Sequence, residues 1–161
     1  NEKEIHFQIV LLEIQDMAEK QRAAQAARER TRLLREKVQA TVLDYTLGRL
    51  NTRLSTTASG LKMLVETPGT GAQVVEKEAV QVHYFGFLTD GTTFDNSFER
   101  SEPITFPVGV GQMIPGFDEG VMQLRHGGKA YLFIPPALGY GENNPESIPP
   151  NAELVFYIEV L

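Results

Sequence analysis

Residues 79–97 read AVQVHYFGFLTDGTTFDNS and contain the clearest structural signals in the sequence. Aromatic and β-branched residues, which are typical of strands, dominate residues 79–88. Asp90-Gly91 follows, a pair that favours a tight turn between antiparallel strands, and Thr92-Thr93-Phe94 then begins a second β-prone run. The stretch therefore predicts a hairpin-like connection within an antiparallel sheet.

Further β-prone runs lie on both sides of this stretch, separated by Gly and Pro. Among them, only residues 117–124 have helical spacing, with Phe117, Val121 and Leu124 on one face. One short helix beside an antiparallel sheet indicates the α+β class. The runs predicted as strands are Lys62–Glu66, Ala79–Leu88, Ile104–Val108, Lys129–Ile134 and Glu153–Leu161.

The N-terminal third of the chain has a different composition. Residues 15–54 contain no Pro and a single Gly, Gly48, and they are rich in Ala, Arg, Leu, Glu and Gln, which favour helix. Gly48 is the weakest interior position of this predicted helix. We therefore predict a long helical arm and linker over residues 15–55, followed over residues 56–161 by a domain that we expect to fold on its own.

Residues 1–14 form a separate segment in this interpretation. Ile5, Phe7, Ile9 and Leu11 alternate with the period of a strand, and residues 4–12 align without gaps to residues 153–161 with four identities. This predicts a short strand over residues 4–12, either the remnant of a preceding domain or a strand used for oligomerisation. The alternative is an N-terminus that is helical throughout.

Composition and charge narrow the classes of protein. The chain has 161 residues, of which 42% are apolar and 22% charged, as in soluble globular proteins, and it has no apolar run long enough to span a membrane. It has no Cys, which excludes disulfides and thiolate sites. Residues 55–161 hold five basic and thirteen acidic residues, which argues against nucleic-acid binding. The three His residues lack metal-ligand spacing, so we expect no metal or other cofactor.

A series of short motifs then identifies a known family. The motifs are VHYFG (82–86), DGTTFDNS (90–97), GQMIPGFDEG (111–120), GGKA (127–130), IP (134–135), LGYG (138–141) and IPPNAELVF (148–156). In this order and at this spacing they resemble an FKBP-type peptidyl-prolyl cis/trans isomerase over residues 59–161. The resemblance implies an antiparallel twisted sheet wrapped around one short helix.

The resemblance also implies an apolar site that accepts Xaa-Pro segments of unfolded or partly folded chains. The residues that it assigns to catalysis are Asp95, Ile114, Phe117 and Tyr140. Those that it assigns to substrate binding are Tyr84, Phe94, Arg100, Ile104, Met113, Ile148 and Phe156. The reaction needs no nucleophile, general base or metal. The alternative function is a chaperone-like or scaffold module that binds proline-containing segments with little turnover.

The layout of arm and domain resembles the macrophage-infectivity-potentiator type of bacterial envelope foldase. This resemblance implies a homodimer through the N-terminal segment and a periplasmic or envelope location, with the cytoplasm as the alternative. Macrolides are implied as inhibitors. Phe117 stands where the family often has tryptophan, Ile104 where an aromatic residue is common, and Asn144 near the place of a frequent histidine. These differences bear on macrolide affinity and on the preferred residue before proline.

Overall fold

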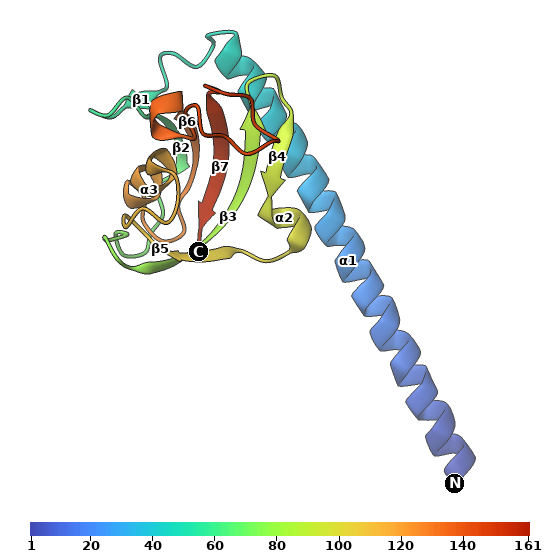
Figure 1. Ribbon diagram of the computed structural model, residues 1–161. Helices are drawn as coiled ribbons and strands as arrows, with labels where there is room; N and C mark the ends of the chain where they lie inside the picture. The colour runs from blue at the N-terminus through green and yellow to red at the C-terminus, as the bar shows by residue number, and fades with distance from the viewer. The chain divides into compact units, whose positions relative to one another are not determined.

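The computed structural model describes residues 1–161 and contains one seven-stranded antiparallel sheet (Figure 1). Its strands lie in the order β1-β2-β6-β7-β3-β4, and β5 pairs with β3 at the same edge as β4. The elements are α1 (Glu2–Thr46), β1 (Ser55–Thr56), β2 (Lys62–Thr67), β3 (Ala79–Leu88), β4 (Thr93–Asn96), α2 (Ser97–Arg100), β5 (Ile104–Pro107), α3 (Pro115–Met122), β6 (Lys129–Ile134), η1 (Pro136–Leu138) and β7 (Leu154–Val160). The predicted α+β class and all five predicted strands of residues 62–161 are confirmed, with ends that differ by at most one residue.

The inner face of the sheet packs against α3, and this layer holds the main core. Phe117 and Val121 of α3 are fully buried against apolar side chains from β3, β6 and β7. Strand β3 supplies Val82 and Tyr84 to this face. Because successive side chains of a strand point to opposite faces, Phe85 and Phe87 belong to the outer face, although both are also fully buried.

The outer face is covered by the last part of α1. The Tyr45 ring stacks on that of Phe133 in β6 with 3.9 Å between centroids, and Val38 and Val42 are buried. At the rim, Lys37 forms an ion pair with Glu66 of β2 at 2.8 Å. Both faces of the sheet are therefore covered, which explains why the central strands are apolar on both sides.

The chain divides into two compact units, residues 1–36 and residues 37–161. The boundary falls within α1, so the last part of this helix belongs to the same unit as the sheet. The first unit is a helical segment whose side chains are nearly all exposed.

The predicted strand over residues 4–12 is wrong, because these residues lie inside α1. The segment has no Gly or Pro, and the alternation breaks down after Ile9, where Val10, Leu12 and Ile14 are also apolar, so its pattern fits a helix equally well. The Oδ1 atom of Asn1 also accepts the Glu4 N–H at 3.0 Å, as an N-terminal capping residue does. Residues 4–12 are therefore helical although their sequence is similar to that of residues 153–161.

The long helix ends near the weak point that the sequence indicates. Gly48 has a φ of 71°, a left-handed conformation that glycine adopts without strain. Its N–H donates to the carbonyl of Tyr45, and the Arg49 N–H donates to that of Asp44. These two bonds form a Schellman motif, which stops α1 at Thr46, earlier than the predicted linker.

The predicted connection at Asp90-Gly91 joins β3 to β4. The Asp90 carboxylate accepts the Thr92 N–H at 2.8 Å, and the Leu88 N–H donates to the Thr92 carbonyl at 2.8 Å. This turn places β4 along β3, so that Asp95 lies opposite Gly86 in the register.

Candidate functional site

An aromatic group at one end of the inner core brings together four of the predicted site residues. Phe117 and Phe156 meet edge to face with 5.2 Å between ring centroids, and Phe94 meets Phe156 in the same way at 5.4 Å. Tyr84 lies edge-on to Phe117 at 5.9 Å. Phe117 has no exposed surface, whereas Phe94 is half-buried. Phe117 therefore lies at the bottom of the group and Phe94 at its solvent-accessible edge.

Gly86 of β3 makes this arrangement possible. A Cβ atom at this position would lie 2.7 Å from two ring atoms of Phe94 and 3.1 Å from the ring of Phe156. The contacts with Phe94 are too short for a Cβ atom and that with Phe156 is tight, so glycine lets these rings lie over the strand in this arrangement.

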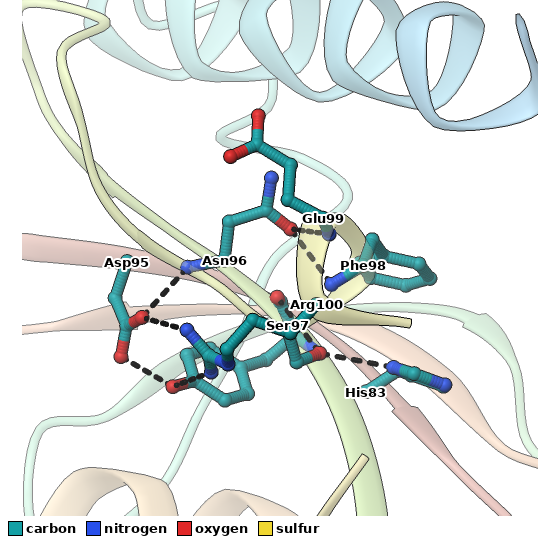
Figure 2. A network of polar contacts seen from close by, with 8 residues as sticks. His83, Asp95, Asn96, Ser97, Phe98, Glu99 and Arg100 are labelled. Carbon is teal, nitrogen blue, oxygen red and sulfur yellow. Dashed lines mark hydrogen bonds and ion pairs between the residues drawn. The ribbon is translucent and has the colours of Figure 1, made fainter. Parts of the chain in front are cut away.

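A closed polar network lies beside the aromatic group. The Tyr84 hydroxyl donates to Oδ2 of Asp95, and Nη1 of Arg100 donates to Oδ1 of Asp95 at 3.0 Å (Figure 2). The second guanidinium nitrogen, Nη2, donates to the Tyr84 hydroxyl at 3.1 Å. Three residues from β3, β4 and α2 are thereby joined in a ring of hydrogen bonds, and the side chains of Asp95 and Arg100 remain 42% and 51% exposed.

The electrostatics of this network keep Asp95 charged. Burial by itself would raise the pKa of the Asp95 carboxyl, but the hydrogen bonds from Tyr84, Arg100 and the Asn96 N–H outweigh it and lower this pKa. Burial first, and then the hydrogen bond to Asp95, raise the pKa of Tyr84 to about 12. At neutral pH the network therefore pairs a carboxylate with a guanidinium and a neutral phenol, so neither Asp95 nor Tyr84 is suited to proton transfer.

The other predicted site residues surround the same core. Ile148 is buried, and the side chains of Ile104, Met113, Ile114 and Tyr140 are partly buried against the core. Burial, and then the negative charge of Asp95, raise the pKa of the Tyr140 phenol. The structure thus places all eleven predicted residues in or around one core, with the polar ones at its rim.

The start of α3 fixes the segment that carries Met113 and Ile114. The Ile114 carbonyl accepts the N–H groups of Phe117 and Asp118 at 3.0 and 3.2 Å. Oδ2 of Asp118, which is buried, accepts the Gly111 N–H at 3.2 Å. Asp118 therefore ties the preceding loop to the helix, a role more specific than the favourable interaction with the helix dipole that its position suggests.

Several residues of the site region were missed by the sequence reasoning. Phe106 of β5 meets Phe117 with 5.7 Å between ring centroids, and Asn96 caps α2 by accepting the N–H groups of Phe98 and Glu99. His83 and Ser97 are also linked, at 3.0 Å (Figure 2). Asn and Ser directly after a strand are a typical helix-start signal, so the capping role of Asn96 could have been predicted from the sequence. No signal in the sequence predicts the contact between His83 and Ser97.

No group of three or more His, Asp or Glu side chains is arranged to hold a metal ion. No helix is both long enough and apolar enough to cross a membrane. The described geometry is that of a packed aromatic group with one charged pair beside it.

Comparison with known proteins identifies the family. Residues 71–161 match the family model described as FKBP-type peptidyl-prolyl cis-trans isomerase. This segment is more than half of the chain, so the chain belongs to the FKBP-type peptidyl-prolyl cis-trans isomerase family, as the motifs predicted.

Individual relatives agree with this result. The chain is 50% identical over 108 residues to the FKBP-type isomerase FkpA of Aeromonas hydrophila, which covers 67% of this chain and 40% of that protein. It is 46% identical over 92 residues to an FK506-binding protein of Neisseria meningitidis serogroup C, which covers 56% of this chain and 84% of that protein. The crystal structure of Escherichia coli FkpA superposes with a TM-score of 0.67 at 38% identity, over 76% of this chain and 57% of that one. The chain thus spans less than half of the Aeromonas relative.

Proposed function

We propose that this chain catalyses the cis/trans isomerisation of Xaa-Pro peptide bonds in unfolded or partly folded proteins. The observation that carries the proposal is the junction of the aromatic group with the Asp95–Tyr84–Arg100 network, in a chain of the isomerase family. An Xaa-Pro bond isomerises over tens of seconds without a catalyst, because rotation breaks amide resonance at a cost of about 18–20 kcal/mol.

The proposed mechanism uses the change in polarity during this rotation. The twisted amide loses conjugation and has a smaller dipole than the planar amide, so it depends less on hydration. An apolar site formed by Phe94 and Phe156, with the buried Phe117 beneath them, therefore favours the twisted state over the planar substrate, which is the requirement for catalysis. In this proposal the proline ring lies against Phe94 and Phe156, above Phe117.

The flanking peptide groups of the substrate need hydrogen-bond donors. No hydrogen bond within the chain uses the Ile114 N–H, which directly precedes α3 and lies next to Met113. The Tyr140 hydroxyl lies within electrostatic range of Asp95, and its raised pKa keeps it protonated at neutral pH. We assign these two donors to the carbonyl groups on either side of the proline.

Asp95 acts in this proposal through Tyr84. Both carboxylate oxygens accept hydrogen bonds, from Tyr84 on one side and from Arg100 and the Asn96 N–H on the other. The carboxylate therefore holds the Tyr84 ring in place over Phe117 and, paired with Arg100, places a fixed dipole at the rim. Because Arg100 balances the charge of Asp95, the network does not require a counterion from the substrate.

The experiment that tests the function is a protease-coupled assay with short Xaa-Pro peptides, using the full chain. We expect the conversion of cis peptide to exceed the uncatalysed rate in proportion to the concentration of the chain. The binding-module alternative predicts that the chain holds proline peptides without accelerating this conversion. A folded chain that binds peptide but leaves the rate at background would exclude the isomerase proposal.

The proposal includes a homodimer formed through the N-terminal helix. Near the start of α1, Phe7 is 68% and Leu12 63% exposed. Large exposed apolar side chains of this kind mark interaction surfaces, and a second copy of the same helix offers a matching one. The exposed apolar residues in this part of α1 are Ile5, Phe7, Ile9, Val10, Leu11, Leu12, Ile14 and Met17.

Light scattering tests the dimer. We expect the full chain to be dimeric and a version that starts at Gln15 to be monomeric or weakly associated. A full-length variant with Phe7→Glu and Leu12→Glu should behave like the shortened version, because charges replace the apolar contacts. A full chain that is monomeric at micromolar concentration would contradict the proposed interface.

Location and inhibitors complete the proposal. A periplasmic or envelope location rests on the resemblance to envelope foldases, and fractionation of cells that express the complete protein tests it.

Binding of macrolides such as FK506 rests on family membership, and the Neisseria relative bears the name FK506-binding protein. Inhibition of the peptide assay by FK506 is the corresponding test, with weak inhibition expected if Phe117 and Ile104 reduce the fit.

A further inference from the structure

The single turn of α2 is attached to the sheet on two opposite sides. Phe98 lies on the outer face, where its ring stacks on His83 and on Phe85 with 4.8 Å between centroids in each case. Arg100 reaches the site on the inner side, where it binds Asp95 and Tyr84. Phe98 and Arg100 are two residues apart and therefore point about 200° apart around the helix axis. Any rotation of α2 that shifts the Phe98 ring must also move the guanidinium of Arg100.

A third attachment holds the start of the same turn. At Tyr84, β3 changes its edge partner: the pairing with β4 reaches Phe85, and the pairing with β5 begins at Val82. The Ser97 hydroxyl fills this gap. It accepts the Tyr84 N–H at 2.7 Å and donates to the Tyr84 carbonyl at 3.3 Å.

His83 contacts Ser97 and Phe98, two of the three residues that attach α2 to the sheet. Its Nδ1 lies 3.0 Å from the Ser97 Oγ, and its ring is stacked on Phe98 (Figure 2). Glu159 of β7 lies opposite His83 in the register, so the three residue types of a hydrolytic triad occur here. Ser97, however, is fully buried and its hydroxyl is bound to the backbone of Tyr84, so it cannot act as a nucleophile. The contacts of His83 serve the placement of α2.

We propose that His83 is a positioning residue of the site. Through Ser97 and Phe98 it fixes the rotation of α2 and thereby the guanidinium of Arg100 against Asp95 and Tyr84. Its effect on catalysis rests on the proposed isomerase function, whereas its effect on Arg100 is a property of the folded chain alone. The His83 side chain lies on the outer face of β3, and its ring contact is with Phe98 and not with the rings of the site.

A double-mutant cycle tests this proposal. We expect His83→Ala to lower kcat/KM roughly threefold to tenfold, the size of coupling that contacting residues show. In the Arg100→Ala background, His83→Ala should cause no further loss, because the group that it positions is gone. His126→Ala is the matched control, since His126 contacts Glu78 and Leu161 and not α2. Equal losses from His83→Ala in both backgrounds would overturn the proposal.

Two conservative variants separate the contacts and guard against a variant that fails to fold. His83→Phe keeps a ring stacked on Phe98 but loses the bond to Ser97, and His83→Asn keeps a polar atom near Ser97 but loses the ring. We expect each to recover part of the activity lost in His83→Ala. If neither differs from His83→Ala in kcat/KM while both are folded, the proposed route through Ser97 and Phe98 is wrong.

A spectroscopic measurement decides the positioning claim independently of turnover. In NMR spectra of the full chain, the Nη–H signals of Arg100 should show restricted rotation, because both nitrogens are hydrogen-bonded. His83→Ala and, to a smaller extent, His83→Phe should release this restriction, and His126→Ala should not. Unchanged Arg100 signals in folded His83 variants would refute the claim. Absence of turnover by the unmodified chain would instead refute the isomerase function and leave this readout valid.

Discussion

Tyr45, in the last turn of α1, stacks on Phe133 of β6 with 3.9 Å between ring centroids. The Tyr45 hydroxyl also donates to Glu153, which directly precedes β7, and burial and this hydrogen bond raise the pKa of Tyr45. These contacts connect a residue of the helical arm to two central strands of the sheet. The last part of α1, from residue 37 on, is therefore a structural part of the isomerase domain, and the rest of the helix forms the arm.

The first prediction concerns the domain boundary. The fragment 56–161, which the sequence suggests as the domain, lacks Val38, Val42 and Tyr45 and exposes the outer face of the sheet. Burial of an aliphatic side chain contributes about 1.5–3 kcal/mol, so loss of the two valines alone lowers the free energy of unfolding by roughly 3–6 kcal/mol. Urea denaturation should therefore show that the fragment 37–161 is much more stable than 56–161. Equal midpoints and slopes for the two fragments would contradict this account of the outer face.

The second prediction concerns the site residues. Asp95→Ala removes the acceptor of Tyr84 and Arg100, and hydrogen bonds to charged groups contribute about 1.5–3 kcal/mol, so kcat/KM should fall roughly tenfold or more. Phe117→Leu should also lower kcat/KM, and it avoids the large cavity that Phe117→Ala would leave in the core. His126→Ala should leave kcat/KM unchanged. Losses of similar size in all three variants, each corrected for its folded fraction, would show that the site lies elsewhere.

The third prediction uses the close packing over Gly86. In Gly86→Ala, the new methyl group would contact the Phe94 ring at 2.7 Å, so this ring must move away from Phe156. We expect a clear loss of kcat/KM with retention of the fold, because Phe94 is half-buried and has room to move outward. The thermal midpoint and the peptide assay should be measured on the same sample. Unchanged activity in a folded Gly86→Ala protein would argue that Phe94 does not bind substrate.

The fourth prediction concerns pH and stability at His126. Its two ring nitrogens lie 2.6 Å from the Leu161 carbonyl and from Glu78, and these contacts, in that order, raise the pKa of His126. A raised pKa in the folded state means that the charged form stabilises the fold. This contribution is fully present below the unfolded-state pKa of about 6.5 and is lost as the pH rises through the folded-state pKa.

The measurement is the difference in free energy of unfolding between the unmodified chain and His126→Ala at a mildly acidic and a mildly alkaline pH. The difference should be larger at the acidic pH. Glu78 does not reverse this trend, because its own pKa is lowered and its carboxylate stays charged throughout this range. If the difference in free energy of unfolding grew toward alkaline pH, it would have the wrong sign and would disprove the claim that charged His126 stabilises the fold.

The sheet and the position of Asp95 beside it were predictable because short motifs determine the local backbone conformation. Asp90-Gly91 specifies a turn, and that turn places Asp95 beside β3. The resemblance then pointed to residues such as Tyr84 and Phe117, which the structure brings into contact. The prediction of the sheet succeeded because short segments of sequence determine their own geometry, whereas the site residues were taken from the resemblance and stay a prediction.

The remaining features depend on contacts between distant segments. Phe85 and Phe87 indicate a strand buried on both faces, but nothing in their pattern shows that Val38 and Val42 lie in the layer that covers the outer face. Residues 4–9 alternate like a strand, but Ile9–Leu12 are apolar in succession, so period alone could not separate strand from helix. The stacking of His83 on Phe98 likewise joins a strand to a helix turn fifteen residues later, and no local signal marks it.

The most direct test of the central claim is an NMR exchange measurement on an Xaa-Pro peptide with separate cis and trans signals. Without a catalyst the two forms exchange over tens of seconds, too slowly for cross-peaks between them. A catalytic amount of the full chain should produce cis–trans exchange cross-peaks, and the same amount of Asp95→Ala should produce much weaker ones. A folded, unmodified chain that produces no exchange cross-peaks would contradict the assignment of isomerase activity to this site.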